Sequence, residues 1–274
     1  MNKLKKLIRG LHLLIKKPSL INLILEDNEQ YREIAIKRHQ LENGLQQVDF
    51  SAIATGNKLT VDPFSFLDGT SLPTDFALLR SLAERFKVKT YLEIGTWRGA
   101  SVANIAQIVP ECYTLNLPDE KLREMKLGEN YIQSHRFFSK NLKNVKHLFG
   151  NSHQYDFEKL DKKFDMIFID GDHHYEAVKK DTETAFKLLR DENSIIVWHD
   201  YAYSPEKIRW GVMLGILDGC PPDKRNKIFH VSNTLCAVFC NEKFETKTLV
   251  PYTLPSKKFK LDIHIQNTGI PDQT

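Results

Sequence analysis

The stretch YLEIGTWRGAS, residues 91–101, decides the fold. The apolar run Thr90–Ile94 predicts a short strand, and Ala100–Ile108 predicts the helix that follows it. Gly95 and Gly99 lie in the turn between them, where residues without a β-carbon let a ligand approach the backbone closely. The turn lacks the Gly-x-Gly-x-x-Gly spacing of dinucleotide-binding loops. It predicts a ligand-binding turn of another kind, with an ordinary tight turn as the alternative.

Strands and helices alternate along the rest of the chain. We expect seven strands, at Thr90–Ile94, Cys112–Leu117, Val145–Phe149, Met166–Ile169, Ser194–Trp198, Ile228–Val231 and Leu235–Phe239. Three residues separate the last two strands, which is enough for a hairpin but too few for a parallel crossover. The pattern predicts an α/β fold with a doubly wound, mostly parallel seven-stranded sheet and an antiparallel last strand. We expect helices at Thr74–Phe86, Ile132–Leu142, Tyr175–Leu189 and Pro205–Leu217, among others.

The chain of 274 residues divides into three predicted parts. Glycines and prolines in residues 51–73 are typical of a loop, so residues 1–73 form an N-terminal helical extension and linker. Residues 74–245 form the main domain, and residues 246–274 form a C-terminal tail. The composition, 41% hydrophobic and 27% charged, excludes a disordered or fibrous chain. No apolar run reaches the ~18 residues that a membrane span needs.

Positive charge gathers at the N-terminus. The net charge of +4 is too small to indicate nucleic acid, and we expect no such partner. The first 17 residues hold six lysines and arginines and no acid, so the rest of the chain carries a net charge of −2. Leucines and isoleucines recur there at helical spacing, which predicts a basic amphipathic helix within residues 1–26. Such a helix can lie on an anionic membrane surface. The alternative is a helix docked on its own domain or on a second subunit of a homo-oligomer.

The cysteines indicate the compartment. The four of them, Cys112, Cys220, Cys236 and Cys240, form no Cys-x-x-Cys pair, which argues against a zinc site. A low cysteine count favours a reducing environment. We therefore expect a cytoplasmic protein, and the first helix leaves open a peripheral position at the inner membrane surface.

Acids and histidines follow two later strands. FIDGDHHY, residues 168–175, ends one strand, and VWHDY, residues 197–201, ends the next. Because these strand ends are neighbours in a doubly wound sheet, we expect Asp170, His199 and Asp200 to converge. Oxygen and imidazole ligands suit a divalent ion such as Mg²⁺ or Mn²⁺, which would lower the pKa of a substrate hydroxyl. His173 suits a general base, because histidine is the side chain that exchanges a proton near neutral pH. Alternatively, His199 forms a hydrogen bond without any metal.

The motif Glu93-x-Gly95-x-x-x-Gly99 resembles motif I of class I S-adenosylmethionine-dependent methyltransferases. The resemblance implies that the glycines abut the methionine part of the cofactor and that Glu93 orders the loop near its cationic end. It extends to Asn116, where the family usually has a ribose-binding acid, and to Asn151, which replaces the aspartate of a Gly-Asp-Ser motif near the adenine. An amide can still hydrogen-bond hydroxyl groups, but without the charge. The cofactor-binding residues implied are Glu93, Gly95, Thr96, Gly99, Ser101, Asn116, Asn151 and Ser152.

The motif Ile169-Asp170-Gly171-x-His173 resembles a metal-dependent branch of the family. This branch includes macrolide-sugar O-methyltransferases and cephalosporin-hydroxylase-like proteins. There the aspartate is a magnesium ligand and the histidine the proposed base, so the resemblance implies that Asp170 and His173 are catalytic. His199 and Asp200 take the place of the Glu-Asp pair that completes the ligand set in that branch. The resemblance covers residues 74–245.

The expected activity is methyl transfer from S-adenosylmethionine to a hydroxyl oxygen of a sugar, glycan or other small molecule, assisted by a metal. One alternative is a non-catalytic S-adenosylmethionine-binding module that acts through its N-terminal helix. Another is an oxidoreductase on the same sheet, because fold alone does not fix function. The missing dinucleotide fingerprint speaks against the oxidoreductase. Turnover that depends on Asp170 and His173 would distinguish the enzyme from the binding module.

Overall fold

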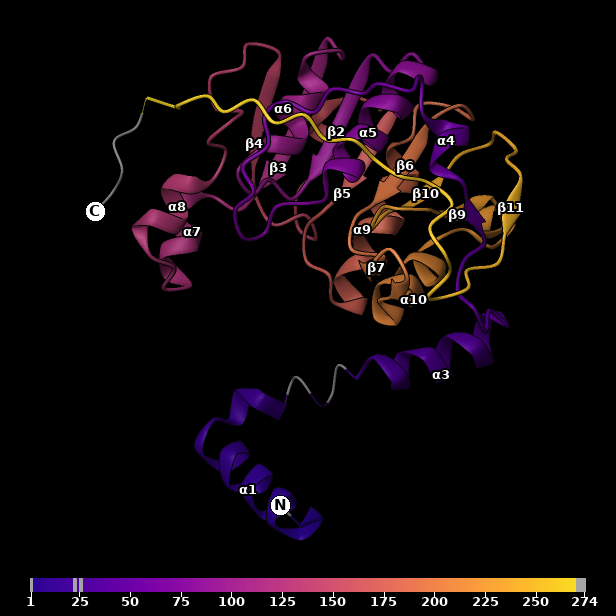
Figure 1. Ribbon diagram of the computed structural model, residues 1–274. Coiled ribbons are helices and arrows are strands. Elements are labelled where there is room, and N and C mark those ends of the chain that lie inside the picture. The colour runs from indigo at the N-terminus through magenta and orange to yellow at the C-terminus, as the bar shows by residue number, and fades with distance from the viewer. Residues whose placement is uncertain (1, 22–23, 25–26, 270–274) are drawn as a thin grey trace.

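The computed structural model describes residues 2–21, 24 and 27–269 (Figure 1). Its centre is a nine-stranded sheet in the order β11-β1-β9-β10-β6-β5-β2-β3-β4. The predicted α/β class is confirmed, with two more strands than the seven expected. The strands are β1 (Gln47–Val48), β2 (Thr90–Ile94), β3 (Glu111–Asn116), β4 (Val145–Phe149), β5 (Met166–Ile169), β6 (Ile195–Trp198), β9 (Ile228–Val231), β10 (Ala237–Phe239) and β11 (Thr246–Lys247).

The strand directions follow the prediction. β2, β3, β4, β5 and β6 pair in parallel, and β10 is antiparallel to both β6 and β9. The two additional strands form the far edge: β1 pairs in parallel with β9, and β11 pairs antiparallel to β1. Each has only two residues, which is too short for a period-two pattern to reveal it.

Helices cover both faces of the sheet. One face packs against α3 (Asn28–His39), α9 (Tyr175–Leu188) and α10 (Trp210–Gly219). The other face packs against α4 (Phe50–Ile53), α5 (Pro73–Arg85) and α6 (Ala100–Ala106). Two short helices, α7 (Asp119–Glu124) and α8 (Glu129–Ser134), follow β3 at its carboxyl end. Short 3₁₀ helices lie at η1 (Pro18–Ile21), η2 (Phe157–Leu160) and η3 (Pro222–Lys227).

Several predicted helices have different bounds in the structure. α5 begins at Pro73 rather than Thr74, because Asp75 accepts a hydrogen bond from the backbone N–H of Leu72 at 2.7 Å. The helix expected over residues 132–142 is replaced by the shorter α8, which begins at Glu129 and ends at Ser134. The one expected from Pro205 begins at Trp210, because residues 202–208 form a hairpin of β7 (Ala202–Ser204) and β8 (Lys207–Ile208).

The packed body extends to the N-terminal side of residue 74. Asn28 in α3 donates to the carbonyl of Ile208 at 3.1 Å and accepts from the backbone of Trp210 at 2.8 Å. Further along, Val48 and Ile53 are fully buried. Residues 28–53 therefore share the core of the main domain, and packing does not break at the predicted boundary. By contrast, α1 (Lys3–Lys16) contains no buried residue.

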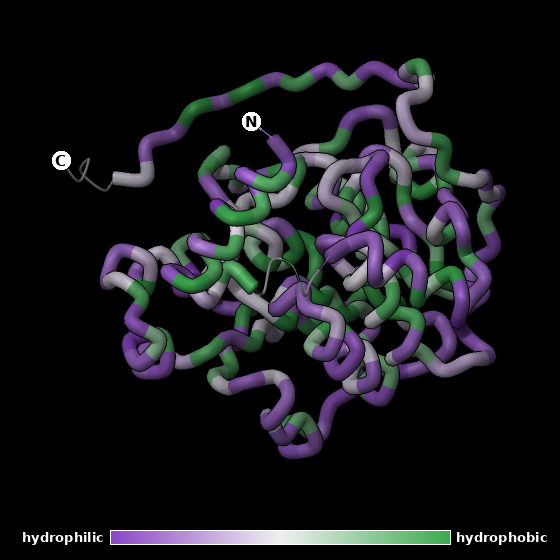
Figure 2. Tube along the Cα trace, turned by 90° about the horizontal axis from the view of Figure 1, so that it is seen from below, coloured by the Kyte–Doolittle hydropathy of each residue, from purple (hydrophilic) through white to green (hydrophobic). Residues whose placement is uncertain are grey.

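The C-terminal tail leaves the body after β11. Leu249 is still buried, and beyond it the described chain runs in an extended form over the surface, with hydrophilic and apolar residues alternating (Figure 2). Among the described residues, no helix has the length and apolar character to cross a bilayer.

Candidate active site

The turn after β2 needs both of its glycines. Gly95 has φ 99°, and a β-carbon there would lie 2.1 Å from the carbonyl oxygen of Asp170. Gly99, with φ 76°, precedes the first residue of α6, and a β-carbon there would lie 2.2 Å from Oγ of Ser139. Both backbones are in the left-handed region that favours glycine. The turn after β2 thus touches the end of β5, backbone against backbone.

A buried hydrogen-bond network lies under this turn. Glu93 is fully buried and accepts from the hydroxyls of Tyr91 at 2.8 Å and Thr114 at 3.3 Å, and also from Ser101. Burial raises the pKa of Glu93 to about 8. The Thr96 hydroxyl hydrogen-bonds to that of Thr114. The predicted residues Glu93, Thr96 and Ser101 therefore share one hydrogen-bond network at the base of the turn.

The end of β3 places Asn116 beside an aromatic cluster made of Trp97, Tyr131 and His135. Nδ2 of Asn116 donates to Nδ1 of His135 at 2.6 Å. Burial lowers the pKa of His135 to about 4, so the ring is neutral and its nitrogen can accept. The His135 and Tyr131 rings lie 4.8 and 4.4 Å from that of Trp97. The amide oxygen of Asn116 is an acceptor of the kind that a ribose hydroxyl requires.

Asn151 and Ser152 lie in the turn after β4. Asn151 is exposed, and its Oδ1 accepts from the backbone of His153 at 2.9 Å. Ser152 hydrogen-bonds to Asp181 of α9, a carboxylate that is 1% exposed and whose pKa is raised by burial. The turn is therefore fixed both by its own backbone and by α9.

The ends of β5 and β6 bring the three predicted metal ligands together. Nδ1 of His199 lies 3.1 Å from Oδ1 of Asp170 and 3.7 Å from Oδ2 of Asp200. About a quarter of each carboxylate side chain is exposed, whereas His199 is 8% exposed. Asp200 has φ 58°, an uncommon backbone conformation for a residue with a side chain.

The other imidazole nitrogen is held by a residue that the sequence analysis did not single out. Nε2 of His199 lies 3.2 Å from Oδ2 of Asp75, which is fully buried. Burial alone would lower the pKa of His199, but the carboxylates of Asp170, Asp200 and Asp75 outweigh it and raise the pKa well above the ordinary value. The ring is therefore fixed in position, with Nδ1 turned toward the two carboxylates at the strand ends.

This arrangement fits a divalent ion. Each of Asp170, His199 and Asp200 offers a ligand atom within 4.8 Å of the other two. Among the described residues, none makes an aligned hydrogen bond to the buried Nδ1 of His199. A carboxylate on the second nitrogen is the usual support of a metal-bound histidine, a part that Asp75 would play. One imidazole and two carboxylates suit Mn²⁺ at least as well as Mg²⁺.

His173 lies at the rim of the same site. It is exposed, and a small pocket is lined by Asp170, His173, His199 and Asp200, among others. Its ring stacks on that of His174 with centroids 5.4 Å apart and planes at 10°. Asp172 accepts from the backbone of His174 at 2.9 Å, which forms the turn before α9. The predicted base is thus accessible to a substrate beside the acid cluster.

Two residues that the sequence analysis missed also contribute to the acid cluster. Asp75 lies at the start of α5 and completes the N-terminal cap of that helix. Arg209 lies 3.5 Å from Asp200, and its Nε and Nη1 atoms make no hydrogen bond to any described residue. No local motif marks either residue, because Asp75 lies in α5 and Arg209 precedes α10, away from the ends of β5 and β6 in the chain.

Comparison with known families shows what the central part of the chain resembles. Residues 92–201 match the family model of a methyltransferase domain. Residues 92–201 are thus similar to a methyltransferase domain. The match begins within β2 and ends just beyond β6, so the methyltransferase model includes every predicted site residue.

Individual proteins resemble the methyltransferase domain more loosely. A viral protein of unknown function from Acanthamoeba polyphaga mimivirus is 28% identical over 157 residues, which cover 50% of this chain and 65% of the viral protein. The chain thus spans less than two thirds of that relative. Among solved structures, an O-methyltransferase of Bacillus cereus in complex with SAH is 17% identical, covers 70% of this chain and 89% of its own, and has a TM-score of 0.41. An amino pentose methyltransferase of Micromonospora echinaspora, bound to SAM, is 15% identical, covers 47% and 52%, and has a TM-score of 0.35.

Proposed function

We propose that the protein transfers a methyl group from S-adenosylmethionine to a hydroxyl oxygen of a sugar, glycan or other small molecule, assisted by a divalent ion. One observation carries the proposal. Gly95 of the cofactor motif lies against the backbone of Asp170, the first ligand of the acid cluster. A cofactor held by the turn would therefore present its reactive end beside the cluster.

The turn and its surroundings fit the cofactor. A β-carbon at Gly95 would meet the backbone of Asp170, and one at Gly99 would meet Ser139, so both glycines let the turn pack closely against its neighbours. Asn116 would bind the ribose through its amide oxygen while its NH₂ group keeps the bond to His135. The Asn151 turn, on the next strand, would face the adenine. These contacts would bind and orient the cofactor without an acid on the ribose.

The acid cluster fits a hydroxyl acceptor. When bound, S-adenosylmethionine supplies an electrophilic methyl group, and a divalent ion on Asp170, His199 and Asp200 would lower the pKa of the acceptor hydroxyl. Asp75 keeps the imidazole of His199 oriented. His173 would receive the hydroxyl proton on its imidazole at the rim of the pocket. An amine acceptor, which can react in its neutral form, would have less need of a metal ion and a general base.

Calorimetry followed by an acceptor screen tests the proposal. S-adenosylhomocysteine should bind to the purified protein, and Mn²⁺ or Mg²⁺ should bind with an affinity that Asp170→Asn removes. Asp161→Asn, the same change at an exposed residue directly after η2, should leave both affinities intact. Methyl transfer to sugars should then require the metal. Full activity in excess chelator, or in Asp170→Asn, would overturn the metal-assisted mechanism.

The alternative function is a binding module without turnover. It is favoured by one observation, that α1 has no buried residue and is available to a membrane or partner. This module would bind S-adenosylhomocysteine but methylate no acceptor, and His173→Ala would change none of its properties. A single acceptor methylated in a His173-dependent manner decides against it.

A further inference from the structure

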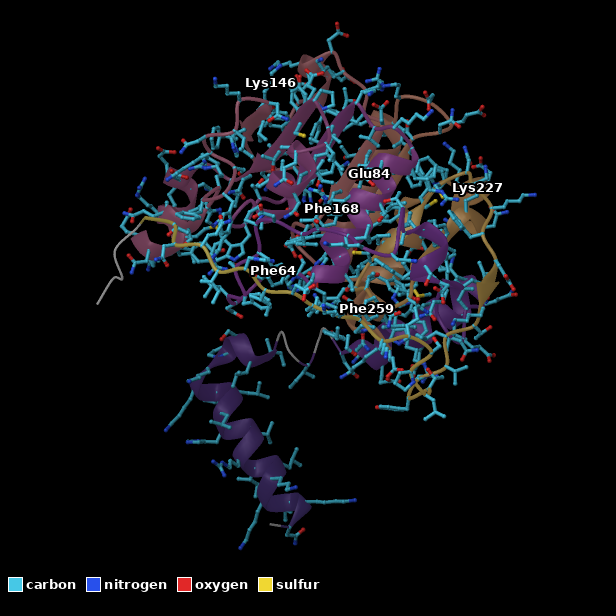
Figure 3. The ribbon with its side chains drawn as sticks, turned by 45° about the horizontal axis from the view of Figure 1, so that its top comes forward. Phe64, Glu84, Lys146, Phe168, Lys227 and Phe259 are labelled. Atoms are coloured by element: carbon cyan, nitrogen blue, oxygen red, sulfur yellow. The ribbon has the colours of Figure 1, made fainter. Side chains whose placement is uncertain are left out.

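Helix α1 stands apart from the rest of the molecule. Figures 1 and 3 show it well separated from the body. In Figure 3 the label Phe168 marks the buried strand β5 inside that body. None of its residues from Lys3 to Lys16 is buried. Leu4, Leu7, Ile8 and Leu11 are each more than half exposed. Leaving so many large apolar side chains in water is costly, so this face is expected to have a partner.

The apolar and cationic residues of α1 lie on different faces. At about 100° per residue, one apolar stripe covers roughly a third of the helix circumference. The stripe consists of Leu4, Leu7, Ile8, Leu11, Leu14 and Ile15. Lysines and Arg9 occupy much of the remaining circumference, together with a single leucine, Leu13. The hydropathy colouring in Figure 2 shows the two kinds of residue interleaved along the N-terminal coil.

We propose that α1 lies flat in the surface of an anionic lipid bilayer. Its apolar stripe would enter the boundary between headgroups and acyl chains, and its cations would face the phosphates. The helix has 14 residues, about 21 Å, which is too short to cross the ~30 Å hydrocarbon layer. A helix of this length with this charge therefore lies on the membrane rather than through it.

Charge decides between a bilayer and a second copy of the chain. The first 17 residues hold six cations, and no acid precedes Glu26. Two copies of α1 packed stripe to stripe would bring ten cations together without a compensating acid on either helix. An anionic lipid surface supplies the opposite charge along the whole helix. The remainder of the chain, with a net charge of −2, offers no comparable surplus.

The side of the molecule on which α1 lies agrees with this proposal. In Figure 1, α7, which follows β3, and β7, which follows β6, lie on the same side of the sheet as α1. The carboxyl ends of these strands border the candidate active site. A bilayer that holds α1 would thus face the open end of the domain. The inference itself requires no methyl transfer and stands on the helix alone.

Vesicle flotation with the full-length protein tests the proposal. The protein should float with phosphatidylglycerol vesicles at least about tenfold more than with phosphatidylcholine vesicles, and high salt should reduce the difference. Leu11→Gln, on the stripe, should weaken binding about tenfold or more. Leu13→Gln makes the same change on the cationic side and should have little effect. Lys6→Gln should weaken binding to anionic vesicles only.

Three results would overturn the proposal. Equal losses in Leu11→Gln and Leu13→Gln would mean that the stripe does not enter the lipid. Equal flotation with neutral and anionic vesicles would remove the role of charge. Failure to bind either vesicle, combined with a dimer in light scattering that Leu11→Gln converts to a monomer, would assign the stripe to a second copy of the chain. Circular dichroism of each variant, compared with the wild type, verifies that the domain is folded.

Discussion

Asp75 holds the imidazole of His199, with Oδ2 3.2 Å from Nε2, although 124 positions separate the two residues in the chain. The same carboxylate accepts from the backbone of Leu72 at 2.7 Å and from that of Leu235 at 2.8 Å. One buried side chain therefore caps α5, anchors the turn before β10 and orients the histidine of the acid cluster. A change at Asp75 must affect both the stability of the fold and the properties of the site.

Asp75→Asn should lower Mn²⁺ affinity by about 10–100-fold, since it removes the charge that supports His199. It should also lower the free energy of unfolding by roughly 1 kcal/mol through the weakened helix cap. Calorimetry and urea denaturation measure the two effects. Asp27→Asn alters the cap of α3, where Asp27 accepts from Glu29, and should change stability alone. Equal Mn²⁺ affinity in both variants would show that Asp75 does not act on the cluster.

Gly95→Ala should reduce S-adenosylhomocysteine binding by about tenfold or more. The new β-carbon would lie 2.1 Å from the Asp170 carbonyl and would need a backbone with φ 99°, so the turn must move. Gly56→Ala is the matched control, because no atom lies within 4 Å of the position of its β-carbon. Affinity is measured by calorimetry. Unchanged binding in Gly95→Ala would mean that the cofactor does not use this turn.

His230 should make the fold sensitive to acid. The side chain is fully buried in β9, and burial lowers its pKa to about 4 from an ordinary 6.5, although the carboxylate of Asp75 opposes the shift. Between these values the unfolded chain binds a proton that the native protein does not, so stability falls as pH decreases through this window. The full effect is about 3 kcal/mol. The loss of stability is absent well above the ordinary pKa of 6.5 and is complete only below the folded-state pKa of about 4.

Urea denaturation between about pH 7 and pH 5 measures this dependence. In His230→Gln the loss of stability across that interval should be smaller than in the wild type, even if the variant is less stable throughout. His12→Gln, at an exposed position on α1, should follow the wild-type curve. Parallel curves for His230→Gln and the wild type would assign the acid sensitivity to other groups.

His173→Ala should lower the rate of methyl transfer most at neutral pH, with a smaller loss at high pH, where solvent can remove the hydroxyl proton. The affinity for S-adenosylhomocysteine should stay unchanged, because His173 lies at the rim of the pocket rather than in the cofactor turn. His264→Ala, in the exposed tail, should be silent. A rate loss that does not vary with pH would indicate that His173 only positions the acceptor.

The sequence predicted the parts of the fold that depend on short-range patterns. The apolar runs of β2, β5 and β6 and the hairpin spacing before β10 are local, and the structure confirms them. The strands β1 and β11 depend on long-range contacts, because both residues of each strand pair with residues far along the chain. Pro205 was placed in a helix because a hairpin as short as β7–β8 leaves no clear periodicity.

The same distinction applies to the site. The strand ends placed Asp170, His199 and Asp200 side by side, since topology alone brings adjacent parallel strands together. Asp75 and His135 lie beside site residues only through the packing of α5 and of the segment after α8. A single sequence contains no signal for such contacts. Glu93 was expected near the cofactor, and the buried bonds it makes with Tyr91 and Thr114 became visible only with the three-dimensional arrangement.

The position of β1 constrains the order of assembly during synthesis. Gln47 pairs with His230, so the N-terminal edge of the sheet cannot close until almost the whole domain has left the ribosome. Helix α1 needs no such partner, because its hydrogen bonds are local and its apolar stripe faces outward. Among the described elements, α1 leaves the ribosome before β1 can become fixed in the sheet. With α1 bound to a bilayer as proposed, a nascent chain would already be tethered while the sheet was still being completed.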